Sequence, residues 1–560
     1  MTQVRDLMSY GALTVQAGRR LADIVGRLRR IGHEGYPVVD TDGQIVGLLT
    51  ARDMNRATEN GLEDMRVEDV MMAGQVSVSP ETAVHALLAQ MVATDWGQIP
   101  VVENNALVGI VTRTDVIRHY AQLEYNSIHT VTDAEVRRVL GEPIAALIAF
   151  VAKQAAAQEK TIYMVGGVVR DLLLKRPNLD IDFVLEGDAM AFAQSLDEEF
   201  GGVVKTHEAF GTATWTFDDT AAGHIGQPLD ALPEYIDLVT TRFEFYEEPA
   251  VLPTVYNSGI RLDLRRRDFT INALAVKLSA NGAGGEVIDL FGGLRDLEHK
   301  QVRVLHSLSF ADDPTRILRG VRFAHRLGFK IEPRTAQLIE NALPMLKRTT
   351  GERLRNEITL LLKEPQPEEA LLKLQRTGVL QAIHPAFVLD ADLLRRAFTQ
   401  LQAEPLIHPP EEEGMLRWVL VATSMDAEYA EQVANRMLFK KATTQAMKAA
   451  AQLTEYPDEY FSGKPSDITF RLEKLPLDAV LAVWVAIANE PEDRAAIANY
   501  ITTWRHVQII TDGNDLKHAG LQPGPHFKTI LQKLRAGRIN GAIASDDDEK
   551  RALRTLIESE

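Results

Sequence analysis

Two spacings of apolar residues divide the chain. Short apolar runs bounded by turn residues, and stretches in which apolar and polar residues alternate, are typical of strands and recur up to about residue 245. From about residue 270 onward, apolar residues recur mostly at helical spacing, with few strand signals. The pattern predicts an α+β chain of several domains, with strands and helices mixed in the first part and a second half that is all-helical.

The first 120 residues contain an internal repeat. Each copy has a helical stretch, a short apolar strand that begins at a proline, a turn, a second strand and a helix that opens at Thr-x-x-Asp. The matching segments, offset by 63, 63 and 62 residues, are residues 4–8 and 67–71, 37–40 and 100–103, and 47–53 and 109–115. Because neither β-rich half can close a core alone, we expect the two copies to pack as a pair.

The repeat resembles a tandem CBS domain, an α/β module. The resemblance implies that Thr50 and Asp53, and Thr112 and Asp115, lie where CBS domains bind the ribose and phosphate of an adenine nucleotide. CBS pairs without a ligand also serve as dimer interfaces, so nucleotide binding and homodimerisation both stay open. Related chains often place a DHH phosphoesterase domain before the pair. This sequence starts at Met1 directly with the repeat, so either that domain is absent, which the Met1 start favours, or the sequence is a fragment of a longer chain.

A turn rich in glycine is the first candidate for phosphate binding. A strand that starts at Thr161 ends at Gly166 and Gly167, and a helical pattern follows. Such a turn lets the backbone approach a phosphate closely with its N–H groups pointing outward. Arg170 can add a guanidinium for a phosphate oxygen.

Paired carboxylates follow in the next strand pattern. Asp180 and Asp182 are two residues apart in an apolar run, so a strand places both on one face while Ile181 and Phe183 face the core. Adjacent carboxylates repel unless a cation bridges them. Mg²⁺ prefers such carboxylates together with substrate phosphates. The sequence therefore predicts a magnesium site here.

Five ordered motifs give the sequence its most specific resemblance. The Gly-Gly turn and the Asp-x-Asp pair are followed by the segments 266–273 (Arg-Arg-Asp-Phe-Thr-Ile-Asn-Ala), 289–297, 312–319 and 352–357. Together they resemble a class II tRNA nucleotidyltransferase of the bacterial poly(A) polymerase family over roughly residues 140–380, and more loosely to the end. The resemblance implies a polymerase-β-like head with a mixed sheet, followed by an all-helical neck, body and tail.

The resemblance also implies roles for individual residues. Asp180 and Asp182 would hold two Mg²⁺ ions, one to activate the RNA 3′-hydroxyl and one to neutralise the triphosphate. Asp237 is a candidate third carboxylate, with an ordinary acid on a strand face as the alternative. The residues expected to bind the nucleotide are Gly166, Gly167, Arg170, Asp171, Arg266, Arg267, Asp268, Asn272, Asp313, Arg316 and Arg319.

Base selection is expected from Asp313 and Arg316. They are three residues apart, so a helix would place them on one face. A carboxylate accepts from the exocyclic amino group of C or A, and a guanidinium donates to a ring nitrogen or to O2 of C. U and G carry a carbonyl at that position and would be rejected. The family has Glu where this chain has Asp312, a shorter acid expected to orient the arginine and so to affect base switching rather than chemistry.

Two further segments bear on the substrate. Residues 240–259 contain prolines and a glycine typical of a mobile loop, and the family's loop here helps the site change from C to A. Its presence argues against a CC-only enzyme and leaves full CCA addition and A-only addition open. RNA phosphate contacts are expected from Lys517, Lys528, Lys533, Arg535 and Arg538.

Composition narrows the class of protein. The 560 residues are 45% hydrophobic, as in packed domains, and carry a net charge of −17, which excludes a uniformly basic nucleic-acid coat. The absence of cysteine excludes disulfides, zinc fingers and thiol nucleophiles. We see neither a signal peptide nor an apolar run long enough to span a membrane, so we expect a cytoplasmic protein without membrane contact.

The expected organisation is a CBS pair at 1–120, a helical linker at 121–140, a nucleotidyltransferase head at 141–270, a base-recognising neck at 271–360, and a helical body and tail at 361–560 that bind tRNA. The expected activity is addition of CCA, or part of it, to the tRNA 3′ end from CTP and ATP with Mg²⁺ and no nucleic-acid template. The alternatives are an A-only adding enzyme, a poly(A) polymerase, or a catalytically inactive CBS-based adenylate sensor that binds RNA.

Overall fold

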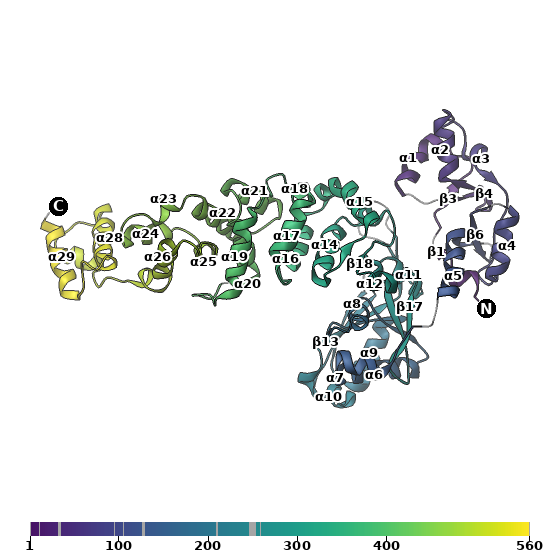
Figure 1. Ribbon diagram of the computed structural model, residues 1–560, viewed down its shortest axis with the longest axis horizontal. Helices are drawn as coiled ribbons and strands as arrows, with labels where there is room; N and C mark the ends of the chain where they lie inside the picture. The colour runs from purple at the N-terminus through teal and green to yellow at the C-terminus, as the bar shows by residue number, and fades with distance from the viewer. Residues whose placement is uncertain are drawn as a thin grey trace. The chain divides into compact units, whose positions relative to one another are not determined.

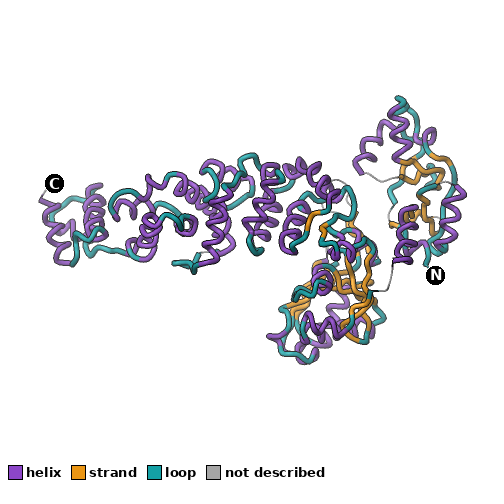
Figure 2. The backbone as a smooth tube through the Cα atoms, viewed as in Figure 1, coloured by secondary structure: helices purple, strands orange, loops and turns teal. Residues whose placement is uncertain are grey.

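The structure is a computed structural model that separates into two compact units, Met1–Leu297 and Glu298–Glu560. Strands concentrate in the first unit, and the second is nearly all helix (Figure 2). The mixed α+β class with a large helical C-terminal part is confirmed. The residues described are 2–10, 12–31, 35–94, 96–104, 106–125, 129–208, 211–245, 254–257, 259–410 and 412–558.

The repeat folds into two small sheets with helices, drawn in purple and blue in Figure 1. Their elements are β1 (Ser9–Tyr10), β2 (Val15–Gln16), α1 (Leu21–Ile31), β3 (Gly35–Val39), β4 (Ile45–Thr50), α2 (Ala51–Glu59), α3 (Val67–Val70), β5 (Met72–Ala73), α4 (Val84–Thr94), β6 (Gln98–Glu103), β7 (Ala106–Thr112) and α5 (Arg113–Tyr125). The sheet orders are β2-β3-β4-β5 and β1-β7-β6.

Each copy of the repeat completes the core of the other. Val4, Leu7 and Met8 are buried in the cluster formed mainly by the second copy. The equivalent Val67, with Met71 packed against it, belongs to the cluster of the first copy. The expectation that the two copies pack as a pair is therefore confirmed, with the leading segment of each copy exchanged.

The rest of the first unit is built on one mixed sheet of eight strands. Its order is β11-β12-β13-β10-β9-β16-β17-β8, and the β10–β13 pair is parallel while the other pairings are antiparallel. The strands are β8 (Thr130–Val131), β9 (Thr161–Val165), β10 (Asp182–Glu186), β11 (Val203–His207), β12 (Thr212–Thr216), β13 (Tyr235–Thr240), β16 (Leu274–Ser279) and β17 (Gly282–Asp289), and β14 (Arg242–Phe245) and β15 (Thr254–Asn257) form a separate hairpin.

Helices cover this sheet and connect its strands. They are α6 (Asp133–Leu140), α7 (Glu142–Ala157), α8 (Gly167–Leu173), α9 (Ala189–Phe200), α10 (Asp219–Ile225), α11 (Ile260–Arg265), the 3₁₀ helix η4 (Thr270–Asn272) and α12 (Gly293–Glu298). The apolar α7 packs against β17, β16 and β9, and α9 packs against β12 and β13. Strand β10 lies between β13 and β9 in the middle of the sheet, and its first residue, Asp182, pairs with Asp237 on the β13 side.

Strands β16 and β17 correct one expectation. The all-helical pattern predicted after about residue 270 is wrong for this hairpin, which forms part of the sheet. The glycine-rich stretch at 282–285 suggests a loop, but here glycine permits close backbone approach. A Cβ on Gly285 would lie 1.9 Å from the carbonyl oxygen of Lys277 on β16.

The second unit begins with a short two-stranded sheet and continues as consecutive helices, coloured from teal to yellow in Figure 1. Its elements are β18 (Gln301–Val302), α13 (Ser309–Asp312), α14 (Arg316–Leu327), β19 (Lys330–Ile331), α15 (Pro333–Ala342), α16 (Gly351–Leu362), α17 (Pro367–Arg376), α18 (Val379–Ile383), α19 (Ala391–Ala403), α20 (Glu413–Ala422), α21 (Ala427–Arg436), α22 (Lys441–Glu455), α23 (Pro457–Phe461), α24 (Pro465–Leu472), α25 (Leu477–Ala486), α26 (Pro491–Thr502), α27 (Gly513–His518), α28 (Pro525–Ile539) and α29 (Asp546–Glu558). Among the residues described, no helix is both long and apolar enough to cross a membrane.

The hairpin gives a stability prediction. Replacing Gly285 by Ala forces a methyl group against the backbone of β16, and overpacking of this kind costs about 1–3 kcal/mol. Gly223→Ala is the matched control, since Gly223 is an exposed position of α10 where a Cβ meets nothing within 4 Å, and this change should stabilise by up to about 1 kcal/mol. Calorimetric melting of both variants tests this. A G285A protein that melts at the wild-type temperature would contradict the packing described.

Candidate active site

Carboxylates meet where β10 and β13 run parallel. Asp182 is the first residue of β10 and lies in register with Asp237 of β13. Asp180 is exposed and precedes the strand, so the expectation that both acids sit within one strand is wrong for Asp180. Its backbone N–H donates to Oδ1 of Asn178 at 2.8 Å. The hydroxyl of Thr214 donates to Oδ1 of Asp237 at 2.6 Å.

The surroundings of Asp182 make its charge costly. Burial, with smaller contributions from Asp180, Asp237 and Asp263, raises the pKa of this carboxyl to about 6, although Arg267 acts in the opposite direction. An incoming cation would relieve the repulsion. The described residues contain no group of three or more His, Asp or Glu side chains placed to hold a metal ion unaided. The corner fits a hard divalent cation that takes one or two carboxylates here and completes its shell with water and substrate phosphates.

The Gly-Gly turn lies next to these carboxylates. Gly166 has φ +76° and caps α8, a left-handed conformation that glycine adopts without strain. A Cβ at this position would lie 2.5 Å from Nη1 of Arg267 and 3.9 Å from Oδ2 of Asp182. The glycine thus makes room for a guanidinium beside the carboxylate.

Arg170 and Asp171 form a buried network behind the turn. Nε and Nη2 of Arg170 donate to the two oxygens of Asp171 at 2.8 Å each, and Nη1 donates to Oδ1 of Asn272 at 2.7 Å. Asn178 also donates to Asp171, at 2.8 Å. Arg170 is 3% exposed. In this arrangement Arg170 ties α8 to η4, and its guanidinium is engaged rather than presented to a phosphate.

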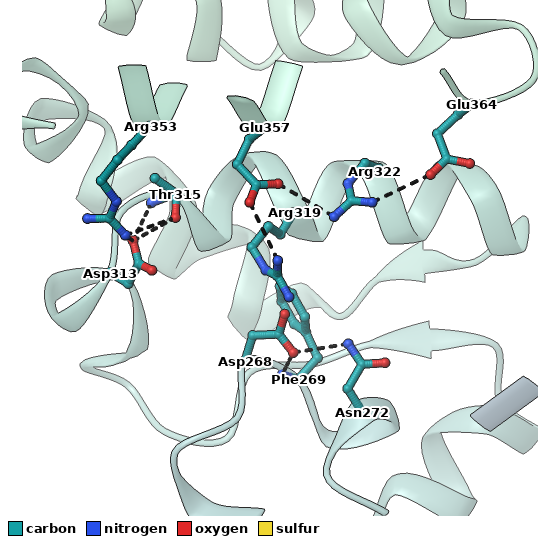
Figure 3. Close-up of polar contacts among 10 residues, drawn as sticks. All are labelled: Asp268, Phe269, Asn272, Asp313, Thr315, Arg319, Arg322, Arg353, Glu357 and Glu364. Carbon is teal, nitrogen blue, oxygen red and sulfur yellow. Dashed lines mark hydrogen bonds and ion pairs between the residues drawn. The ribbon is translucent and has the colours of Figure 1, made fainter. Parts of the chain in front are cut away.

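Three residues of the Arg-Arg-Asp motif lie at the end of α11. Arg266 and Arg267 both donate to Asp263, a fully buried residue that the sequence did not single out. Asp268 accepts from the backbone N–H of Phe269 at 2.8 Å and from the amide of Asn272 at 3.0 Å (Figure 3). The signal for Asp263 is its spacing, three and four residues before two arginines, which brings side chains together on a helix.

In the second unit, Asp313 lies between two helices. The prediction that it shares a helical face with Arg316 is wrong: α13 ends at Asp312, Asp313 is extended with φ −143° and ψ 101°, and α14 begins at Arg316. The cause is visible in the sequence, because Pro314 disfavours a helical conformation in the residue before it. Arg316 donates from Nη1 to the hydroxyl of Ser309 at 2.7 Å.

Asp313 is held by two residues outside the predicted set. Its Oδ1 accepts from the N–H of Thr315 at 3.0 Å, from the hydroxyl of Thr315 at 2.7 Å and from Nη2 of Arg353 at 2.8 Å (Figure 3). Arg353 belongs to the last motif segment, 352–357, and this membership is the feature of the sequence that could have pointed to it. Burial raises the pKa of the neighbouring Asp312, and its Oδ2 lies 3.6 Å from Nε2 of His306.

Charged residues of α14, of α16 and of the turn after α16 form an ion-pair ladder. Arg319 and Arg322 both pair with Glu357, at 3.5 Å each, and Arg322 also pairs with Glu364 at 3.6 Å (Figure 3). Burial lowers the pKa of Arg322. Arg319 is the one of these residues that we expected to bind the nucleotide, and the structure places it in the ladder.

The basic residues expected to contact RNA divide into two groups. Lys517, Lys528 and Lys533 are exposed on α27 and α28. Arg535 instead pairs with Glu473, and Arg538 pairs with Asp546 and Glu549. The two arginines therefore connect helices within the unit, whereas the lysines face outward.

In the repeat, the predicted ligand residues are helix caps. The hydroxyl of Thr50 accepts from the N–H of Asp53 at 3.1 Å, and Oδ2 of Asp53 accepts from the N–H of Thr50 at 3.1 Å. Thr112 and Asp115 repeat this capping box at the start of α5. The other oxygen of Asp115 lies 3.5 Å from Nη2 of Arg261. The prolines of the expected loop, with the rest of residues 246–253, lie outside the residues described.

Comparison with known proteins matches separate parts of the chain to different protein families. Residues 162–303 match the poly A polymerase head domain, residues 328–389 match a probable RNA- and SrmB-binding site of polymerase A, and residues 4–60 and 67–122 each match a CBS domain. An A-adding tRNA nucleotidyltransferase of Halalkalibacterium halodurans is 32% identical over 71% of this chain and 88% of that protein. This chain belongs to the tRNA nucleotidyltransferase family. Both resemblances drawn from the motifs are thereby confirmed.

Other relatives of this family member differ in length and specificity. An A-adding tRNA nucleotidyltransferase of Geobacter sulfurreducens is 33% identical over 99% of this chain, which spans 64% of that protein's length. The Thermotoga maritima CCA-adding enzyme complexed with tRNA is 26% identical, with a TM-score of 0.59 over 78% of this chain and all of that one. Polymerase-type nucleotidyltransferases of this family generally depend on a divalent metal.

The charge at Asp182 predicts a pH-dependent stability. Its folded pKa of about 6 lies above its ordinary value of 3.8, so without divalent cations the folded state loses stability as pH rises through this window. Asp182→Asn should therefore be more stable than wild type at pH 7, by about 1–3 kcal/mol at roughly 1.4 kcal/mol per pKa unit. Near pH 4 the two should be equal.

Denaturant unfolding in EDTA at several pH values measures this difference. Glu198→Gln, at an exposed position of α9, is the control that should change nothing at any pH. Equal stability of wild type and D182N at pH 7 would mean that Asp182 is not destabilised by its neighbours.

Proposed function

We propose that this chain extends the 3′ end of tRNA with CCA, or with part of it, from CTP and ATP without a nucleic-acid template. In this reaction the 3′-hydroxyl oxygen bonds to the α-phosphorus, and the bond from that phosphorus to pyrophosphate breaks. The observation that carries the proposal is the corner formed by Asp182 and Asp237, in register on parallel strands, with Asp180 before it and Arg267 beside the Gly166 turn.

Mg²⁺ is the proposed cation. Asp180 and Asp182 would hold two such ions, with Asp237 as the third carboxylate, because hard divalent ions favour carboxylate oxygens together with substrate phosphates. When bound, they would lower the pKa of the 3′-hydroxyl and neutralise charge on the triphosphate. The protein's own contribution is the Gly166 turn, which leaves space for Arg267, and the buried Arg170–Asp171 pair, which fixes that turn against η4.

Base selection is proposed for Asp313 and Arg316. In the described residues the hydrogen bonds of Asp313 fall on Oδ1, from Thr315 and Arg353, so Oδ2 is the atom offered to an exocyclic amino group of C or A. U and G carry a carbonyl there. The hydrogen bond from Arg316 to Ser309 fixes the guanidinium near the start of α14.

The exposed lysines of α27 and α28 are the proposed contacts to tRNA phosphates. Lys517, Lys528 and Lys533 face solvent, and each phosphate contact that they make adds to the salt dependence of binding. Because the proposed substrate is tRNA, we place the reaction in the cytoplasm, which cell fractionation can check.

A-only addition is the principal alternative, because two relatives at 32% and 33% identity are A-adding enzymes. Three labelled tRNAs, ending before CCA, after the first C and after CC, distinguish the readings when incubated with CTP, ATP or both. Extension of all three to CCA supports full CCA addition. Extension of the CC-ending tRNA alone by one A supports A-only addition, and long A tracts support a poly(A) polymerase. No extension of any would favour the adenylate-sensor alternative.

Loss of Asp180 should abolish transfer. We expect Asp180→Ala to reduce the extension rate by at least about 100-fold, the scale on which a single electrostatic group acts in catalysis. Glu198→Ala removes an exposed carboxylate on α9 and is the control that should retain wild-type activity. Full activity of D180A under saturating Mg²⁺ would refute the metal assignment.

We further propose that the CBS pair binds an adenine nucleotide and forms a homodimer. The exposed apolar residues Val92 on α4 and Ile117 and Tyr120 on the adjacent α5 support dimerisation. The capping boxes at Thr50 and Thr112 mark the proposed nucleotide positions. Equilibrium dialysis of AMP, ADP and ATP against wild type and Asp53→Asn tests the binding.

The dimer has its own test. Ile117→Glu should convert a dimer to a monomer in light scattering, because it buries a charge in the apolar contact. Val203→Glu is the matched control, since Val203 is 65% exposed on β11, which is not part of the repeat, and Ile117 is 60% exposed. A wild-type monomer, or a dimer that survives I117E, would remove this surface from the proposal.

A further inference from the structure

A fully buried carboxylate lies on the short helix that precedes the Arg-Arg-Asp motif. The side chain of Asp263 on α11 is 0% exposed. Burying an ionised carboxylate is costly unless it is paired and hydrogen-bonded. The position of Asp263 therefore depends on the partners that surround it.

Those partners are the two arginines of the motif. Oδ1 of Asp263 accepts from Nε of Arg266 at 3.0 Å and from Nη2 at 2.6 Å, while Oδ2 accepts from Nη2 of Arg267 at 3.3 Å. The side chains of Arg266 and Arg267 are 20% and 18% exposed. One fully buried carboxylate thus binds two guanidinium groups. The two arginine side chains are partly exposed to solvent, whereas the carboxylate is not.

Arg267 extends from this anchor into the carboxylate corner. Its Nη1 lies 3.5 Å from the backbone oxygen of Asn272, and the absence of a side chain at Gly166 leaves it room. Its Nε is buried and has no hydrogen-bond partner among the residues described. A buried cationic donor without a partner is suited to an anionic ligand, and Nη1 of the same guanidinium lies at the Gly166 turn next to Asp182.

We propose that Asp263 is a positioning residue for the nucleoside triphosphate, acting chiefly through Arg267, which its Oδ2 holds. The inference rests on the proposed nucleotidyltransferase function. Asp263 cannot touch the nucleotide, because it has no exposed surface. It fixes the planar guanidinium groups before the ligand arrives, so that less side-chain freedom is lost on binding. Without it, the attraction between Arg267 and Asp182, which already lowers the pKa of that carboxyl, has no opposing contact from Asp263.

A double-mutant cycle on nucleotide affinity tests this mechanism. The variants are Asp263→Asn, Arg267→Ala and the double variant of the full chain, and the probe is CTP with Mg²⁺, which avoids adenine sites in the CBS pair. We expect D263N to weaken CTP binding about tenfold, the scale of one well-oriented charged hydrogen bond. In the R267A background the same change should weaken it less than twofold, because Asp263 acts through Arg267.

The controls separate positioning from structure. Arg265→Ala, on the same helix but with its side chain directed to Ser9, should bind CTP like wild type. In extension assays D263N should raise KM for CTP with kcat changed less than threefold. If D263N does not fold, as judged by its melting temperature, Asp263→Glu replaces it in the cycle, since it keeps the charge but displaces the carboxylate by one methylene.

The possible results of the cycle distinguish the positioning role of Asp263 from the proposed function. Equal loss of affinity in the wild-type and R267A backgrounds, or no loss at all, would overturn the positioning role while leaving the proposed function intact. Failure of the wild-type chain to bind either CTP or ATP at this site would overturn both. Loss of affinity that disappears in the R267A background would support the proposal.

Discussion

Repulsion between carboxylates at one end of a parallel strand pair is the constraint on which this site depends. Asp182 and Asp237 are brought together by the register of β10 with β13, and the burial of Asp182 raises its pKa to about 6. The fold tolerates this cost because β10 is central in the sheet, where the residues that follow Asp182 pair with both β13 and β9. The folded state is therefore less stable than it would be without this carboxylate, and the negative charge is held where a cation and a triphosphate are to bind.

The positive side of the corner is built by a chain of paired charges. Asp263 holds Arg266 and Arg267, and Gly166 leaves Arg267 the space beside Asp182. Arg170 and Asp171, both buried, neutralise one another and connect the turn to η4. Each guanidinium therefore has a carboxylate that fixes its plane, so the site is organised before a ligand is present.

In the second unit, Asp313 is likewise held in place by charged and polar neighbours. Arg353 and Thr315 occupy one carboxylate oxygen and orient the other, while the ladder of Arg319, Arg322 and Glu357 links α14 to α16. In the CBS pair, the proposed ligand residues have a second role. Its Thr–Asp residues already cap α2 and α5, so the residues proposed to contact a nucleotide also have a structural role in the fold.

The sequence by itself determined the features that depend on local pattern. The internal repeat, the mixed sheet followed by helices, the Gly-Gly turn and the motif residues follow from spacing and residue type, and family membership follows from their order. The extended conformation of Asp313 was also encoded, in Pro314, although helical spacing suggested otherwise. Tertiary structure decided the rest: that 282–289 pairs with β16, that Asp237 lies in register with Asp182, and that Arg170 is buried against Asp171. These are contacts between segments far apart in the chain or choices among partners, and local pattern does not specify the partner that burial and register select.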